Sequence, residues 1–288
     1  MNIDIETIWQ GAVNGFSLGG IYILMALGLT LIFGSMNIMQ LAHGEIYMIA
    51  AYVAYYFCVN AGIDYYLSML MSMIIMALCG VVLEVFFFRR VRGEVMAPIV
   101  ISVSFTLILQ SASIALFGLS QRILPRIAHG SYVVFGSAIP ADRTIVVGIA
   151  IFLVLMLYIF LKKTKYGQAM VASAQSYNGA LLQGISSKTM ATMAMAIACA
   201  LAAAAGVLTG SLYPLTQNMG NQPLIKGLVI IVIGGTGSLV GTIVSGIFLG
   251  LVDALTPLLF GTALTALLPL VIVIAFLLIR PQGLFGHE

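Results

Sequence analysis

The chain has 288 residues, of which 61% are hydrophobic and only 7% are charged, and its formal net charge is +3. Ordinary globular domains carry about 25% charged residues, so this chain cannot build an ordinary water-facing surface. The composition excludes an ordinary soluble protein, and the small net charge implies no nucleic-acid partner.

We expect an all-α fold, a polytopic membrane helix bundle that forms one domain over residues 1–288. A spanning helix needs about 20 apolar residues. The apolar runs predict about eight transmembrane segments, some of them broken or re-entrant.

The first predicted crossing covers residues 8–33 and carries a strip of glycines. Gly11, Gly15 and Gly19 recur every four residues, which places them on one face of a helix. Such a face lets a neighbouring helix approach closely. We therefore expect this strip to pack against another helix.

The second apolar segment, residues 38–57, is entered through a run of polar side chains that begins at Ser35. An ionisable side chain inside a bilayer costs roughly 2.5–3.5 kcal/mol on insertion scales, so each one needs a partner or a function. His43 and Glu45 are two residues apart and point about 200° apart on a regular helix, which disfavours a catalytic dyad or a shared metal site. We expect the polar side chains either to pin helices together or to line a substrate pathway. The candidates are Asn37, Gln40, His43 and Glu45.

Basic clusters indicate the direction of the next crossings. Residues 65–88 run into Arg89, Arg90 and Arg92, a pattern typical of a cytoplasmic helix end. Counting back three crossings places the N-terminus outside, and the acidic first ten residues, which contain no Lys or Arg, agree with this.

Two more crossings, residues 96–119 and 144–161, flank a loop expected on the outside. Arg122, Arg126 and Arg143 in that loop run against its placement there. The second crossing ends at a lysine cluster starting at Lys162, which predicts another cytoplasmic end.

The segment 162–189 is too polar to span a membrane. Its part from Gly167 to Leu182 is rich in small residues and has helical character, and Gly184 ends it. We expect one short helix lying along the cytoplasmic face of the membrane.

The last third of the chain contains a crossing over residues 190–212, an apolar stretch over residues 225–255 and a final run over residues 262–279. Small residues recur every fourth position in the first of these and predict a tight helix–helix interface. They are Ala194, Ala198, Ala202, Gly206 and Gly210.

A glycine-rich helix break interrupts residues 225–255, at Gly234, Gly235 and Gly237. The piece before it has only about 10–12 residues, or roughly 15–18 Å of helix, which favours a re-entrant or sharply broken helix. If the break separates two segments, Arg280 lies inside, as the positive-inside tendency prefers. If the stretch is one crossing, Arg280 lies outside.

Enzyme motifs are missing from the sequence. The glycine cluster GGTGSLVG has no following lysine, so it does not form a nucleotide-binding P-loop. We expect no catalytic residues, no cofactor and no metal site. The other ionisable side chains at membrane depth, Glu84, Asp253 and Lys226, form no series suited to proton relay.

Four stretches of the chain resemble permease subunits of ABC importers for branched-chain (hydrophobic) amino acids, of the first-permease type. They are ALGLTLIFGSMNIMQLAHGEIYMIAAYVAY, YGQAMVASAQSYNGALLQGI, KGLVIIVIGGTGSLVGTIVSGIFLGLVD and RPQGLFG. The resemblance implies that a second, similar permease subunit completes the pore as a heterodimer. It also implies two ATPase subunits beneath the pore and an external or periplasmic binding protein that delivers substrate.

In such importers the cytoplasmic loop transmits closure of the ATPases. The resemblance therefore implies an ATPase-coupling role for its small and polar positions. These are Gly167, Ala172, Ala174, Gln175, Ala180, Gly184 and Ile185. The family often has a basic residue where this chain has Val171 and an acidic one where it has Ser176, so the loop makes fewer charged contacts here.

The sequence thus favours a permease subunit that translocates branched-chain or hydrophobic amino acids across the bacterial inner membrane, with ATP hydrolysed by its partners. A urea or short-amide importer shares the same features. A stand-alone secondary carrier or channel would work without ATP but would more often show a series of buried acids. An intramembrane enzyme would need a nucleophile–base pair or a metal cluster.

Overall fold

The computed structural model describes residues 5–94, 96–128, 130–134, 137–235, 237–261, 267–280 and 283–285. Within them the predicted all-α membrane bundle is confirmed, because six helices are long and apolar enough to cross a membrane. These helices are α1 (Ile5–Met36), α3 (Tyr65–Phe86), α4 (Met96–Phe117), α5 (Ala141–Lys163), α8 (Ser187–Leu212) and α10 (Leu239–Phe260).

Three shorter apolar helices complete the bundle. They are α2 (His43–Tyr55), which continues into a π-helical turn η1 (Tyr56–Asn60), α9 (Asn221–Gly234) and α11 (Leu267–Ile279). Helix α2 begins five residues later than predicted, because residues 37–42 are not helical and Asn37 has a positive φ of 53°. The first five residues of the predicted final run, 262–266, lie outside the described residues.

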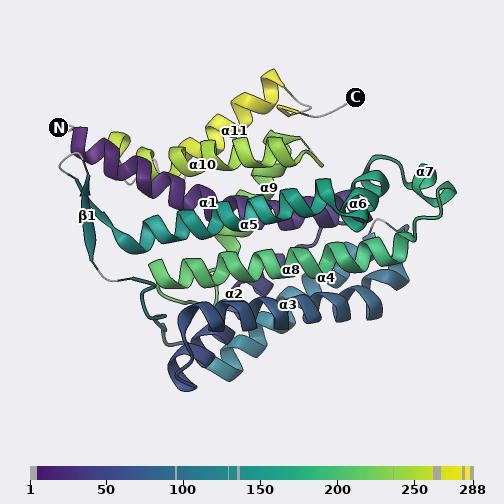
Figure 1. Ribbon diagram of the computed structural model, residues 1–288, viewed down its shortest axis with the longest axis horizontal. Helices are drawn as coiled ribbons and strands as arrows, with labels where there is room; N and C mark the ends of the chain where they lie inside the picture. Colours follow the sequence, from purple (N-terminus) through teal and green to yellow (C-terminus); the bar gives the residue numbers. More distant parts are fainter. Residues whose placement is uncertain are drawn as a thin grey trace.

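The bundle has two distinct ends (Figure 1). At one end lie the first turns of α1 and a hairpin of β1 (Ser131–Val134) and β2 (Ser137–Pro140), with Ser131 opposite Pro140. We call this the hairpin end. At the other, the α6 end, lie α6 (Lys165–Gln175) and α7 (Tyr177–Leu182). This hairpin lies within residues 120–143, which were predicted as a loop containing Gly, Pro and the alternating residues YVVF.

One cytoplasmic helix was predicted where the structure has two. The chain leaves helical conformation at Ser176, whose φ is −153°, and the Ser176 side chain then accepts a hydrogen bond from the Gly179 N–H and caps α7. A serine that caps a new helix costs little, because it satisfies one of the N–H groups that a helix start leaves free. Gly184, with φ of 75°, lies just after α7.

Helix α1 lies inside the bundle and packs antiparallel to α10. Its glycine strip forms the contact, as predicted: a Cβ at Gly15 would lie 2.9 Å from the Leu251 Cα, and one at Gly19 would lie 3.1 Å from the Gly246 carbonyl oxygen. Further along, the hydroxyls of Thr30 and Thr242 lie 3.2 Å apart in a buried hydrogen bond. The start of α10 therefore lies level with the end of α1, at the α6 end.

Helix α8 is the second central element, and its predicted small-residue interface is confirmed. Gly206 lies directly against the backbone carbonyl of Tyr47 in α2. On its other faces, a Cβ at Gly28 of α1 would lie 3.0 Å from the Ala198 carbonyl oxygen, and one at Gly80 of α3 would lie 2.8 Å from that of Met195. Three helices thus touch the backbone of α8.

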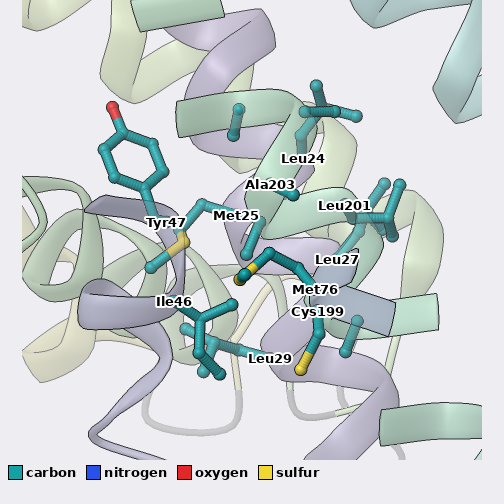
Figure 2. Close-up of a cluster of buried hydrophobic side chains, with 14 of the residues drawn as sticks. Leu24, Met25, Leu27, Leu29, Ile46, Tyr47, Met76, Cys199, Leu201 and Ala203 are labelled. Carbon is teal, nitrogen blue, oxygen red and sulfur yellow. The ribbon is translucent and has the colours of Figure 1, made fainter. Parts of the chain in front are cut away.

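Figure 2 shows the core that these contacts enclose. Leucines and a methionine of α1 meet side chains from α2, α3 and α8, and all the labelled residues are buried. Tyr47 lies at the edge of this cluster and its hydroxyl points away from the other labelled side chains. The ring of Tyr47 therefore belongs to the core and its hydroxyl to a neighbouring space.

The glycine-rich break joins α9 to α10 at the α6 end. Helix α9 ends at Gly234. The φ angles of Gly235 and Gly237 are positive, at 92° and 85°. The Ser238 side chain then caps the start of α10. The N–H groups of Leu284 and Phe285 donate to the carbonyls of Ile233 and Gly234. The described C-terminal residues therefore lie beside the break, at the α6 end.

Candidate functional site

The polar stretch that leads from α1 into the first turn of α2 lies at the junction of α1, α2 and α9. Gly44 faces the backbone of Gly220, which immediately precedes α9: a Cβ at Gly44 would lie 2.8 Å from the Gly220 carbonyl oxygen. His43 packs against Gly28 of α1. Two short helices, α2 and α9, therefore start close together inside the bundle rather than at one of its ends.

The four polar candidates of this stretch divide into two groups. Gln40, His43 and Glu45 are 1%, 0% and 2% exposed, whereas Asn37 is exposed. Within the described residues, both side-chain polar atoms of Gln40, both ring nitrogens of His43 and one carboxylate oxygen of Glu45 have no hydrogen-bond partner. Buried polar groups are normally satisfied, so these atoms indicate bound water or a function beyond packing.

The cytoplasmic loop candidates lie on α6, on α7 and just after them. Gly167 packs against the backbone at the end of α5: a Cβ there would lie 2.8 Å from the Phe160 carbonyl carbon. A Cβ at Gly34 of α1 would lie 3.3 Å from the Ala174 Cβ, so α6 also rests on the end of α1. Gly167 and Ala180 are buried, Ala172 and Ile185 are half-buried, and Ala174, Gln175 and Gly184 are exposed.

A cavity of about 830 Å³ opens in the half of the bundle nearer the hairpin end. Its walls come from α1, α2, α8, α9, α10, α11 and the segment between α8 and α9. Pockets for small molecules typically measure about 300–1,000 Å³ and combine apolar walls with a few polar groups. This cavity fits that description. Lys226 and Asp253 lie in its wall, and it is hereafter called the Lys–Asp cavity.

An ion pair forms the charged part of the Lys–Asp cavity. Lys226 Nζ of α9 lies 2.8 Å from Asp253 Oδ1 of α10, and the two side chains are 14% and 11% exposed. The Tyr22 hydroxyl of α1 donates to Asp253 Oδ2 at 3.0 Å. Tyr47 also lines the cavity, and its buried hydroxyl makes no hydrogen bond to the described residues.

From the sequence, Lys226 and Asp253 were predicted only to be ionisable side chains at membrane depth. They are 27 residues apart, on opposite sides of the glycine break. A sharp helical turn at the break would have placed α9 beside α10. Opposite charges on two adjacent helices would then have been the signal.

A second network of charges has a structural character. Glu84 of α3 is fully buried and accepts bonds of 2.7 Å from Arg89, Arg92 and Thr192. The two arginines lie in and just after η2 (Phe88–Val91), and Thr192 lies in α8. This network ties the α6 ends of α3 and α8 together. No group of three or more His, Cys, Asp or Glu side chains within the described ranges could hold a metal ion.

Comparison with known proteins gives one consistent result. Residues 11–277 match the family model for the permease component of the branched-chain amino acid transport system. The high-affinity branched-chain amino acid transport system permease protein BraD of Pseudomonas aeruginosa is 29% identical over 300 residues, which cover 99% of this chain and 97% of that protein. The corresponding LivH of Escherichia coli K12 is 28% identical over 293 residues, covering 96% and 95%. A probable LivH of Methanocaldococcus jannaschii is 27% identical over 301 residues, covering 98% and 93%.

Proposed function

The chain belongs to the branched-chain amino acid permease family, and from this premise we propose that it imports branched-chain and other hydrophobic amino acids. It does so as the membrane-spanning subunit of an ATP-driven importer in the inner (plasma) membrane. The match over residues 11–277 carries this proposal, because it covers nearly the whole bundle rather than one motif.

The distribution of basic residues supports an orientation. Most of the twelve Lys and Arg residues lie at the α6 end, and the hairpin end has Arg122, Arg126 and Arg143. Cytoplasmic segments of membrane proteins carry the excess of Lys and Arg. The α6 end and the described C-terminal residues then face the cytoplasm, and the N-terminus lies outside.

The surface of α6 and α7 supports a docking role for ATPase subunits. Both helices lie at the α6 end, and they present apolar side chains such as Leu182, which is 89% exposed, and Tyr166, which is 59% exposed. Large exposed apolar side chains beyond the spanning helices suit a protein interface. Gly167 holds α6 against α5, so a push on α6 reaches the spanning helices directly.

The remaining subunits follow from the same proposal. A second permease subunit, similar in sequence, completes the pore, two ATPase subunits dock on α6 and α7, and an external binding protein delivers the amino acid to the hairpin end. The polar residues Gln40, His43 and Glu45 then serve the pathway wall or the junction of α1, α2 and α9.

The test is to disrupt α7 and measure coupling. Proline substitutions or a deletion within Gln175–Leu182 are expected to abolish ATP-dependent leucine uptake and to lower the amount of ATPase that co-purifies with the permease. Proline removes a backbone donor and breaks a helix. Undiminished uptake with full recovery of the ATPase would refute the coupling role. Uptake by this subunit alone, driven by an ion gradient and indifferent to ATP, would favour a secondary carrier instead.

A further inference from the structure

The Lys–Asp cavity has opposite charges side by side in a mainly apolar wall. Ile21, Val229, Leu249 and Val273 line it together with Lys226 and Asp253. Ionisable residues within membrane proteins are expensive and often mark substrate pathways. A hydrophobic amino acid has the complementary chemistry, because its backbone is a zwitterion and its side chain is apolar.

The ion pair keeps unused bonding capacity on both sides. A lysine ammonium has three N–H donors, and Lys226 is bonded to one Asp253 oxygen among the described residues. An ionised carboxylate offers about four acceptor sites, and Asp253 accepts one bond from Lys226 and one from Tyr22. A ligand carboxylate can therefore bind Lys226 while a ligand ammonium binds Asp253, without breaking the pair.

The start of α9 adds a preference for where the negative group lies. Gln222, in the first turn, lines the cavity together with Ile225, Lys226 and Val229 one and two turns further on, as expected for one helical face. The N-terminus of a helix carries a partial positive charge. In transporters, helices that start within the membrane often direct this end at an anionic substrate group. The same wall of the cavity thus holds the helix start and the Lys226 ammonium.

We propose that the Lys–Asp cavity binds the transported amino acid as a zwitterion, with Lys226 holding the α-carboxylate and Asp253 the α-ammonium. The branched side chain lies against the apolar wall, and the unsatisfied Tyr47 hydroxyl offers a further hydrogen bond. This inference rests on the proposed function and extends it, since it places substrate selection in the permease as well as in the binding protein.

A simpler role for the pair would be to pin α9 to α10, and binding without the external protein separates the two. Tritiated L-leucine is titrated against the purified membrane complex, with the binding protein left out. Leucinamide, which lacks the carboxylate, and 4-methylpentanoate, which lacks the ammonium, serve as competitors. We expect saturable leucine binding and competition at least about tenfold weaker from each analogue, the scale of one lost charged hydrogen bond.

Variants test the assignment residue by residue. Lys226→Met and Asp253→Asn are each expected to weaken leucine binding by about ten- to a hundredfold. Lys188→Met, at the α6 end and outside the cavity, is the matched control and should bind like wild type. Because a single change could impair folding, the paired replacement Lys226→Met with Asp253→Leu is included; removing both charges avoids a lone buried ion and is often tolerated.

The outcomes are distinguishable. An assembled paired variant that binds and transports leucine like wild type overturns the zwitterion site and leaves the proposed function intact. Equal competition by leucine, leucinamide and 4-methylpentanoate overturns it as well. If instead the complete wild-type system, with its binding protein and ATP, takes up no leucine, the proposed function itself fails.

Discussion

Gly206 offers a sharp test of how α8 packs, because a methyl group at this position would clash with the backbone of Tyr47. A Cβ at this position would lie 2.9 Å from the Tyr47 carbonyl carbon and 3.3 Å from the Tyr47 Cα, with the carbonyl oxygen closer still. These are backbone atoms, so no side-chain rotation can relieve the clash. In Gly206→Ala, α2 must move away from α8.

The size of the effect follows from two opposing terms. Overpacking a close-packed interior typically costs about 1–3 kcal/mol, and a rigid backbone neighbour places this site at the upper end. Alanine in place of glycine within a helix returns up to about 1 kcal/mol. We therefore expect Gly206→Ala to lower the free energy of unfolding by about 2 kcal/mol, or roughly thirtyfold in the folding equilibrium.

The matched control is Gly148→Ala in α5. Nothing lies within 4 Å of a Cβ at Gly148, so only the helical gain remains and stability should rise by about 0.5–1 kcal/mol. Unfolding of the purified protein by SDS in mixed micelles, followed by far-ultraviolet circular dichroism, measures both. If Gly206→Ala is as stable as Gly148→Ala, the backbone contact between α8 and α2 is wrong. Leucine uptake should fall with Gly206→Ala, since Tyr47 also lines the Lys–Asp cavity.

Three further perturbations address other parts of the molecule. His43→Ala and Glu45→Ala should each reduce assembly and transport together. The yield of the complex measures assembly, and leucine uptake measures transport. A transport defect with normal assembly would instead assign these side chains to the substrate pathway. Gly167→Val should force α6 off the end of α5, because the added side chain overlaps the α5 backbone, and should reduce ATP-dependent uptake about tenfold or more. Unchanged uptake would contradict coupling through the contact between α6 and α5. Glu84→Gln should lower the thermal midpoint by roughly 5–10 °C, since it removes the buried charge that pairs with the half-buried Arg89 and Arg92. An unchanged midpoint would show that the network does not hold α3 to α8.

Much of the bundle was predictable because its determinants are local. Apolar length specifies a spanning helix, and small residues at every fourth position specify a face for close approach. The strip from Gly11 to Gly19 and the ladder ending at Gly210 follow this rule, and both form helix contacts in the structure. The pattern indicates that a helix needs a close neighbour, but it does not identify that neighbour. Only the structure shows that α10 packs against α1.

The candidate site was less predictable from the sequence, since it depends on contacts between segments that are distant in the chain. The polar run that leads into α2 was conspicuous in sequence, yet Asn37 is exposed and the other three candidates are buried. Lys226 and Asp253 meet because the glycine break folds α9 back along α10. The division between α6 and α7 was missed for a different reason: Ser176 is compatible both with a helix interior and with a helix cap, and tertiary packing decides between them.

The pairing of α1 with α10 also has a consequence for how the chain is made. Gly19 meets Gly246, so α1 is synthesised 227 residues before the helix that packs against it. At about 5–20 residues per second, this interval lasts roughly 11–45 seconds. During that time the glycine strip of α1 faces lipid or an insertion factor instead of its final neighbour. Chains that stop before α10 lack this partner, and we expect them to be degraded in cells rather than to accumulate as shortened permeases.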